Sequence, residues 1–465
     1  MTEPAEPPEL KLDELKGASR LLVEAQLRPV QGERFQPTGF PDQGAALYRA
    51  PRRKPNGEVE TDSIGNPVYE DVLLVESAQS MANRMERACW DDGAEDGGRV
   101  GDYNGDCKGI PYVLAVDMNG EKLTASPLEA HRLASPYIWD TQQGKNLTKP
   151  LPEHLREKFG LKTSRLVPWR DVAKTLLEVD PGCLLHGVWF SDKEFSGGKV
   201  RLTRALTGYI EARSPQPANY GFQKRDPVSD RTEREAGQTA ETGYGSVIGP
   251  MQDFTSPDIR AFFQLDVERL RSYGLPHEKL EALLAWAIYK IWKVLSSGRD
   301  AVGDLRTRCK FEVIGKPVAK LLQAGEKPES RRLPKLEAVK PRISILKKDD
   351  GVIQVKWVPK IEGKADLGDV PENDFDLSGF GGKVKIQEEQ KSKRDKSKVK
   401  RVIISGEFTK EDEERLLKTH SAKEKALQVI EKAVKAYRDN YQKKVAGIKP
   451  AEEESQEGKE AEESM

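Results

Sequence analysis

Cysteine is scarce in this chain of 465 residues, which has four: Cys89, Cys107, Cys183 and Cys309. They are widely spaced and form no CxxC pair, and no two histidines stand at the spacing of metal ligands. This pattern argues against a zinc site and against a disulfide framework, so we expect no metal and no cofactor. Unpaired thiols are typical of a reducing compartment, and we expect a cytoplasmic protein.

Long hydrophobic runs are also missing. Hydrophobic residues make up 37% of the chain and aromatic residues 7%, and no apolar run approaches the roughly 20 residues of a membrane span. The N-terminus is acidic and rich in proline, unlike a signal peptide. The sequence therefore predicts a soluble protein without a membrane partner. The modest hydrophobic content indicates that part of the chain is not packed into a core.

A net charge is absent, because 76 basic residues balance 76 acidic ones. The charges are unevenly placed, however, with a basic run at 391–401 and an acidic end at 451–465. A balanced total therefore does not exclude nucleic acid as a partner. The sequence assigns no role to either segment.

The chain is long enough for two or three domains. Composition and hydrophobic pattern predict four parts: a loose lead-in at 1–17, a core at 18–330, an additional β-rich region at 331–408, and a charged helix followed by a disordered acidic tail at 409–465. Within the core, the polar stretch 51–70 is expected to be mobile.

Residues 71–90 predict a strand that leads into a helix. Apolar residues at Ala78, Met81, Ala82, Met85 and Cys89 would form one buried stripe of this helix. The other face carries Gln79, Asn83, Arg84 and Arg87. Ser77 stands at the N-cap position, so the uncovered amides and the positive end of the helix dipole would lie at the strand-to-helix turn. An anion would bind well there, although an ordinary solvated helix face is the simpler interpretation.

Further elements follow on both sides. Residues 18–30 alternate as a half-buried strand, and an Asn119-Gly120 pair predicts a hairpin. Ser126, Pro127 and Glu129 form a capping-box pattern that predicts a helix ending before Pro136. That helix would carry His131 and Arg132.

The later part of the core and the β-rich region after it repeat both kinds of element. Helices are predicted at 168–180, 256–273 and 277–297, and strands at 182–192, 199–212, 309–315, 353–358 and 401–408. Arg201 and Arg204 lie on the second of these strands. The order suits an α+β fold with a mainly antiparallel sheet, and a ferredoxin-like or RRM-type core fits it.

Two irregular stretches combine basic and aromatic residues. Residues 33–44 interleave Arg34 and Gln36 with Phe35 and Phe40. Residues 213–250 have no usable period and place Lys224 and Arg225 close to Tyr220 and Phe222. Such a mixture suits single-stranded nucleic acid, because cations follow the phosphates and rings stack on bases. A solvated loop is the alternative for 213–250.

Several motifs in one order resemble a known family. They are LLVEAQLRPVQGERFQPTGFPDQG, LLVESAQSMANRMERACWD, SPLEAHRLASPYI, LLHGVWF and RLTRALTGYIEA, within residues 18–315. Together they resemble the backbone subunit of the CRISPR type I-G effector, formerly called type I-U, a divergent member of the Cas-seven branch of RAMP proteins. The turn from Ser77 to Gln79 is similar to the Ser-Ser-Gln motif by which type I backbone subunits hold guide RNA, with Ala78 in place of the second serine.

This resemblance implies a modified RRM or ferredoxin-like palm with a long inserted thumb loop, for which 213–250 is the candidate, and additional helices. It implies a protein that is not an enzyme, whose copies form a helical filament along CRISPR RNA in a complex for DNA targeting. Its other partners would be a fused Cas-five/Cas-six type subunit, a large subunit, target DNA and a recruited helicase-nuclease.

The residue pattern and the resemblance together nominate the RNA-binding residues Arg34, Gln36, Ser77, Gln79, Asn83, Arg84, His131, Arg132, Arg201, Arg204, Lys224 and Arg225. Two alternatives stay open. One is a RAMP-type endoribonuclease acting on CRISPR RNA or target RNA, for which His131, His186 and Asp226 would be the catalytic candidates. The other is an RNA-binding module that never assembles.

Overall fold

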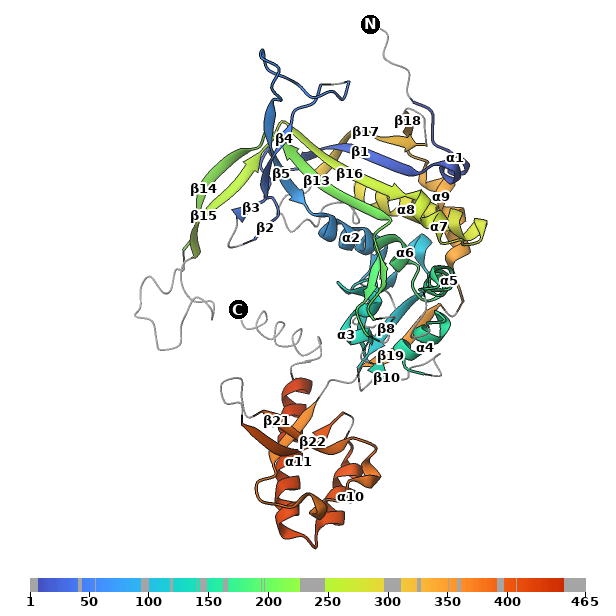
Figure 1. Ribbon diagram of the computed structural model, residues 1–465. Coiled ribbons are helices and arrows are strands. Elements are labelled where there is room, and N and C mark those ends of the chain that lie inside the picture. The colour runs from blue at the N-terminus through green and yellow to red at the C-terminus, as the bar shows by residue number, and fades with distance from the viewer. Residues whose placement is uncertain are drawn as a thin grey trace, which may run out of the picture. The chain divides into compact units, whose positions relative to one another are not determined.

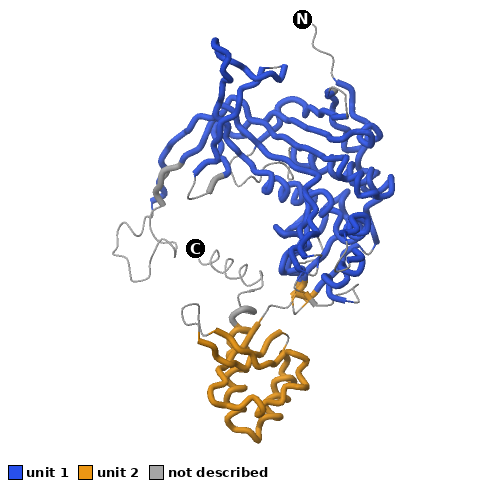
Figure 2. The backbone as a smooth tube through the Cα atoms, viewed as in Figure 1, with its two compact units in different colours: residues 1–115, 122–139, 143–355 blue, residues 116–121, 140–142, 356–465 orange. Residues whose placement is uncertain are grey.

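The computed structural model describes residues 7–40, 44–54, 56–92, 100–117, 120–139, 141–142, 149–161, 166–193, 195, 197–225, 247–296, 311–323, 328–349, 351–357, 361–390, 397–406 and 408–446. The chain divides into two compact units (Figure 2). The first consists of residues 1–115, 122–139 and 143–355, and the second of 116–121, 140–142 and 356–465. The second unit thus unites parts that the sequence divided at residue 409.

A seven-stranded antiparallel sheet organises the first unit (Figure 1). Its strand order is β18-β17-β1-β16-β13-β5-β4. In chain order, these strands are β1 (Arg20–Pro29), β4 (Leu47–Pro51), β5 (Tyr69–Glu76), β13 (Leu206–Arg213), β16 (Asp258–Asp266), β17 (Phe311–Leu322) and β18 (Glu329–Arg332).

The centre of this sheet has the ferredoxin-like arrangement that the sequence predicted. Taken with helices α2 (Ala78–Arg87) and α8 (His277–Leu295), the chain runs β1, α2, β13, β16, α8, β17. The four strands stand in the order β17-β1-β16-β13, so the fourth strand lies beside the first and the third separates the first from the second. This βαββαβ order confirms the α+β class and the RRM-like palm.

One face of the sheet carries the core. In β1, β13 and β16 the buried residues occupy alternate positions, because successive side chains of a strand point to opposite faces. Neighbouring strands place them in rows: Leu21, Leu265 and Leu206 share one, and Val23, Phe263 and Gly208 the next. The alternation predicted at 18–30 is therefore confirmed.

Helix α2 packs closely on this covered face. A Cβ atom on Gly208 would lie 2.6 Å from the Phe263 ring and 3.0 Å from Met81 Cγ. Only glycine leaves room for the helix at this point of β13. Met81, Ala82, Met85 and Cys89 are buried as the spacing predicted, whereas Ala78 is only half-buried.

The lead-in predicted to be loose is structured in part. Helix α1 (Leu12–Gly17) buries Leu15, Leu10 is also buried, and Glu9 forms a β-bridge with Arg332. Residues 1–6 lie outside the described part of the chain.

The segment 213–250 forms an antiparallel pair of strands where it is described. Strands β14 (Gln216–Lys224) and β15 (Val247–Thr255) pair along their whole length and continue outward from β13 and β16 (Figure 1). We call this pair the arm. The prediction of an irregular loop missed these strands, because few of their residues pack against a core and no strong alternation marks them. Residues 226–246 lie outside the described part.

The remaining elements of the first unit surround α2 and α8. The helices are α3 (Pro136–Trp139), α4 (Leu151–Lys158), α5 (Trp169–Val179), α6 (Gly182–His186), α7 (Val267–Ser272) and α9 (Leu336–Ile343). The short strands are β2 (Gly39–Phe40), β3 (Gly44–Ala45), β6 (Trp90–Asp91), β7 (Asp102–Tyr103), β11 (Val188–Phe190) and β12 (Val200–Leu202). A further sheet has the order β10-β19-β8-β9, with β8 (Tyr112–Val116), β9 (Lys122–Ala125), β10 (Thr141–Gln142) and β19 (Val352–Trp357), and the predicted hairpin joins β8 to β9. In the division given above, β10 and the last residues of β8 and β19 are counted with the second unit.

Three sequence predictions in this region are wrong. The helix predicted from Ser126 is a series of turns with a single 3-10 turn, Arg132–Ala134, because Ser126 Oγ accepts a bond from the Val113 N–H at 3.1 Å instead of capping a helix. The strand predicted at 182–192 begins as helix α6. The strand predicted at 199–212 is interrupted at 203–205.

The helix predicted at 256–273 is wrong over 258–266, which form strand β16, and right over 267–272, which form helix α7. Ile259, Ala261, Phe263 and Leu265 alternate and are buried, and β16 pairs with strands on both sides. Sheet pairing therefore overrides the helix-start pattern. The Ser256 hydroxyl that suggested an N-cap donates to the Arg213 carbonyl at 2.6 Å.

The second unit is a three-stranded sheet with two helices. Strands β20 (Glu362–Asp366), β22 (Lys398–Ser405) and β21 (Val384–Gln390) stand in that order, and helices α10 (Lys410–His420) and α11 (Glu424–Ala446) complete the unit. Their shared core includes Val402, Ile404, Leu416 and Ile430. Residues 391–396 of the basic run and the acidic tail 451–465 lie outside the described part.

No helix within the described residues is long and apolar enough to cross a membrane.

Candidate nucleic-acid interface

The start of helix α2 has the features of an anion site. Ser77 is the N-cap, and its hydroxyl accepts a bond from the Ser80 N–H at 3.3 Å. The first turn of the helix contains no acidic residue. Gln79 and Asn83 are exposed one turn apart on the same side of the helix. Amides of a first helical turn have no partner within the helix, so this end can receive a phosphate.

An extended segment connects this helix start with the arm. The Phe35 N–H donates to the Phe254 carbonyl of β15 at 2.9 Å, and the Phe254 N–H donates in return at 2.8 Å. The Thr38 N–H donates to the Val75 carbonyl, two residues before Ser77, at 3.1 Å. Residues 34–38 therefore run from the base of the arm to the end of β5. Gln36, half-buried, lies on this path.

The arm itself presents cations and an aromatic ring. The Arg34 guanidinium carbon lies 4.5 Å from the centroid of the Tyr220 ring, and the Tyr220 hydroxyl donates to Asp253 at 2.9 Å. Lys224 and Arg225 are exposed at the far end of β14. The structure thus places Arg34 and Gln36 near or on the segment that links the start of α2, with Ser77, Gln79 and Asn83, to the base of the arm, and it places Lys224 and Arg225 at the far end of the arm.

Arg84 is more enclosed than the sequence suggested. Its side chain is only 12% exposed, and its Nε lies 3.1 Å from the buried carboxylate of Glu76. Its charge is already matched by a carboxylate, so a phosphate at this helix would gain less from Arg84 than from a solvated arginine.

Arg132 is buried and does not line a surface. It adopts a φ of 51°, and its Nη1 donates to Glu86 Oε1 at 3.0 Å. The helix expected to display it does not form, and the turn that replaces it directs the guanidinium into the core. A contact with RNA at the surface is therefore not available to Arg132 in this conformation.

His131, Arg201 and Arg204 are exposed but belong to a second region, around β11, β12 and the turn at 131–132. The Arg201 guanidinium carbon lies 5.5 Å from the Trp189 ring centroid. Partial burial and the nearby charge of Arg132 lower the pKa of Arg204. The twelve nominated residues thus divide into a set on α2, the 34–38 segment and the arm, a second exposed region, and the ion-paired Arg84 and Arg132.

Of the two histidines of the nuclease alternative, His131 is exposed, whereas His186 lies in the core. Its side chain is fully buried, and burial together with the charges of Lys290 and Arg132 holds its pKa well below the ordinary value. It is therefore neutral and out of reach of an RNA strand. Asp226 lies outside the described residues. In the part of the chain that the structure describes, no group of three or more His, Cys, Asp or Glu side chains could hold a metal ion.

A buried ionic cluster around Glu86 anchors α2, and the sequence analysis missed it. Lys290 Nζ of α8 lies 2.5 Å from Glu86 Oε2, Arg132 Nη1 lies 3.0 Å from Oε1, and His186 Nε2 lies 3.5 Å from Oε1. Burial, followed by the charge of Glu86, raises the pKa of Asp180 beside it. The signal was present in the sequence, because Glu86 lies four residues after Ala82 and three before Cys89, on the buried stripe.

The open face of the palm offers an aromatic pair that the sequence analysis also missed. Tyr209 and Phe262 are register partners, with ring centroids 5.3 Å apart. RRM domains stack bases on such rings. Here Glu24 stands opposite Phe262 and Glu211 follows two residues after Tyr209, and Arg260 beside them is already paired with Glu24 and with Asp258, so less of its charge is available to a phosphate. We therefore place the candidate interface on α2, the 34–38 segment and the arm.

Comparison with known proteins supports a CRISPR assignment. Residues 21–215 match the family model described as CRISPR-associated protein GSU0053. No curated protein matches the chain. Among solved structures, a chain of a "CRISPR RNA-guided surveillance complex, pre-nicking" is similar at 10% identity and a TM-score of 0.28, covering 65% of this chain and 77% of that chain. This TM-score is too low to support the fold, which rests on the strand order above. Residues 21–215 are therefore similar to the CRISPR-associated GSU0053 family, in agreement with the family resemblance drawn from the sequence.

Proposed function

We propose that this protein binds CRISPR guide RNA along α2, the 34–38 segment and the arm, and that several copies assemble along one RNA as the backbone of a type I interference complex. The proposal is carried by one observation: residues 34–38 join the capped, acid-free start of α2 to an arm that bears Tyr220, Lys224 and Arg225.

The chemistry of this surface suits recognition of a strand without regard to its sequence. Backbone amides at a helix start and exposed lysine and arginine side chains contact phosphates, which are the same in every sequence. An arginine stacked on a tyrosine gives a flat surface on which a base can pack. A protein that holds guides of varying sequence needs contacts of this kind.

The partners follow from the proposed role. They are CRISPR RNA, further copies of this chain, a fused Cas-five/Cas-six type subunit, a large subunit, and target DNA paired to the guide. We propose no catalytic step for this chain. In support, His186, one of the two histidines named for the nuclease alternative, is enclosed in the core.

The test is RNA binding at several salt concentrations. Lys224→Ala and Arg225→Ala should each weaken binding of a single-stranded guide RNA and reduce the slope of log K against log salt by about 0.7 for each phosphate that the variant no longer neutralises. Lys174→Ala is the matched control, because Lys174 is exposed on α5, away from the arm. An unchanged slope in both arm variants would remove the arm from the interface.

The two alternatives give different results. Incubation of the purified protein with labelled guide-complementary RNA should leave the RNA intact, and cuts that disappear in Asp226→Ala would establish the endoribonuclease. Mass measurement on a full-length guide RNA should give several copies per RNA. A single copy at saturating protein would establish the solitary binding module.

A further inference from the structure

The edge of the seven-stranded sheet ends in two small lobes. Pro51 and Tyr69 are the last paired residues of β4 and β5. Beyond them, residues 52, 60 and 68 are joined to one another by backbone hydrogen bonds. The Arg52 N–H donates to the Val68 carbonyl at 2.8 Å, the Glu60 N–H to the Arg52 carbonyl at 2.9 Å, and the Val68 N–H to the Glu60 carbonyl at 2.8 Å. This leaves one turn at 53–59 and another at 61–67 (Figure 1). The stretch expected to be mobile is thus hydrogen-bonded.

The turn at 61–67, which we call the docking lobe, presents an isoleucine. The Asp62 carboxylate accepts bonds from the N–H groups of Ile64 and Asn66, both at 2.9 Å, and these bonds lower the pKa of Asp62. The backbone around Ile64 is therefore fixed while its side chain remains 81% exposed. A lobe held in this way loses little conformational entropy when it binds.

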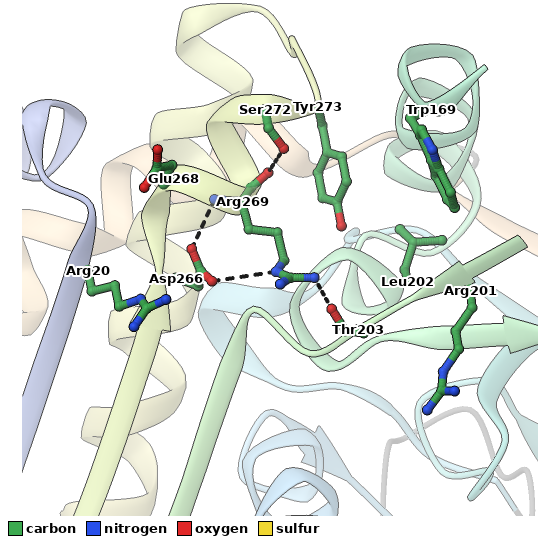
Figure 3. A pocket seen from close by; sticks show the side chains of 10 residues that line it. All are labelled: Arg20, Trp169, Arg201, Leu202, Thr203, Asp266, Glu268, Arg269, Ser272 and Tyr273. Carbon is green, nitrogen blue, oxygen red and sulfur yellow. Dashed lines mark hydrogen bonds and ion pairs between the residues drawn. The ribbon is translucent and has the colours of Figure 1, made fainter. Parts of the chain in front are cut away.

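At the other end of the same unit lies an open pocket of about 500 Å³, which we call the receptor pocket (Figure 3). Trp169, Leu202 and Tyr273 supply its apolar wall. Three arginines line it, with two carboxylates: Arg20, Arg201, Arg269, Asp266 and Glu268. Arg269 is fixed by contacts with Asp266 and with the Thr203 hydroxyl.

Exposed apolar side chains occur in this pocket and next to its lining residues. Trp169 is 39% exposed, and Leu166, three residues earlier, is 96% exposed. Trp189, beside the pocket residue Arg201, is 54% exposed. Large apolar side chains gathered beside a pocket are typical of a contact site, and Trp and Arg are frequent at the energetic centre of protein interfaces.

The lobe and the pocket lie at opposite ends of the sheet. Arg20 and Asp266 are register partners at the pocket end. Arg213 pairs with Asp258 and with Val72 at the other end, from which β4 and β5 continue into the docking lobe. A molecule therefore cannot fill its own pocket with its own lobe, but successive copies can make this contact head to tail.

We propose that the docking lobe of one copy inserts Ile64 into the receptor pocket of the next copy. The charges agree, because the lobe carries Asp62 as its one charged residue while the pocket lining has three arginines against two carboxylates. Those two carboxylates make the pocket a poor site for a nucleic acid. This inference rests on the proposed function, because guide RNA is what brings the copies together.

The direct test uses the full chain on a guide RNA with a photo-crosslinking benzophenone residue at position 64. We expect a crosslink between two copies, to a peptide that contains Leu166 and Trp169 or Arg201 to Thr203. Crosslinks to RNA, crosslinks to another peptide, or no crosslink would each overturn the proposal.

Substitutions give an independent readout. Ile64→Asp should weaken association of copies on a long guide RNA by at least about tenfold, since burial of one large aliphatic side chain stabilises by about that factor or more. Trp169→Ala should act in the same direction, and Ser63→Ala, on the same exposed lobe, should have no effect. If Ile64→Asp assembles like the unaltered chain, the lobe is not an interface.

Binding of a short RNA that holds one copy separates this inference from the proposed function. The Ile64→Asp variant should bind the short RNA as the unaltered chain does. Failure of the unaltered chain to bind it would refute the proposed function, whereas a crosslink formed without RNA at high protein concentration would still support the head-to-tail contact.

Discussion

Removal of the Glu86 carboxylate should be among the most damaging single changes in the first unit. Glu86 and Lys290 are both fully buried, and the 2.5 Å contact between them joins helices α2 and α8. Glu86→Ala leaves the ammonium of Lys290 and the guanidinium of Arg132 in the core without their carboxylate. Breaking a buried ion pair on one side costs about 3–5 kcal/mol. The Trp286 ring, whose centroid lies 4.1 Å from Lys290 Nζ, offsets only part of that cost.

The free energy of unfolding can be measured by urea titration followed by tryptophan fluorescence. Six of the seven tryptophans lie in the first unit, so the signal reports mainly on it. A domain is typically stable by about 5–15 kcal/mol, so the expected loss is a large fraction of the total. Arg87→Ala on the same helix breaks an exposed pair with Asp92, whose side chains are 61% and 64% exposed, and should cost less than about 1 kcal/mol.

A double variant tests the cause. Glu86→Gln keeps an oxygen that can accept from Arg132 but leaves Lys290 without a counter-charge. Adding Lys290→Met removes that buried charge and should restore at least about 1 kcal/mol, so the two changes should not be additive. The reasoning is refuted if Glu86→Ala costs no more than Arg87→Ala, or if Lys290→Met adds its own destabilisation to Glu86→Gln.

Three further predictions concern pH and close packing. His186 stays neutral in the folded protein because its pKa is lowered, while the unfolded chain takes up a proton below about pH 6.5. The free energy of unfolding should therefore fall as pH decreases through that value, by at most about 1.4 kcal/mol per pH unit. Urea midpoints measured at pH 7.5 and at pH 5.0 should differ less in His186→Phe than in the unaltered chain. Gly363→Ala should lower the melting temperature of the second unit, because its Cβ would lie 2.1 Å from the Ala433 carbonyl of α11, whereas Gly379→Ala, which meets its nearest atom at 4.0 Å, should not. Gly208→Ala should destabilise the packing of α2 on the palm and so weaken RNA binding without altering a surface charge, and unchanged calorimetric stability would contradict this.

The fold class followed from local patterns in the sequence. The alternation at 18–30 and the spacing at 71–90 and 277–297 predicted β1, β5 with α2, and α8, which are three parts of the palm. These signals are strong because one side of each element is buried over several turns or residues, and burial selects apolar residues at a fixed period.

Where a local sequence pattern predicted the wrong element, tertiary contacts determined which element forms. The helix-start pattern at Ser256 was overridden because β16 pairs with both β1 and β13, and the capping pattern at Ser126 was overridden because its hydroxyl bonds to a strand. The sequence of the arm also shows no hydrophobic period, because its residues are held by cross-strand hydrogen bonds more than by burial.

The candidate site, too, was determined partly by the sequence and partly by the tertiary structure. The sequence by itself determined the residue types of the proposed RNA-binding surface, with Ser77 at a helix start and Lys224 and Arg225 near aromatic residues. Only the tertiary structure decided which cations can serve it: Arg132 and Arg84 are matched by Glu86 and Glu76, while Lys224 and Arg225 remain exposed. The reason is physical, because the partner of a charge is set by residues that lie far apart in the chain and become neighbours only when it folds.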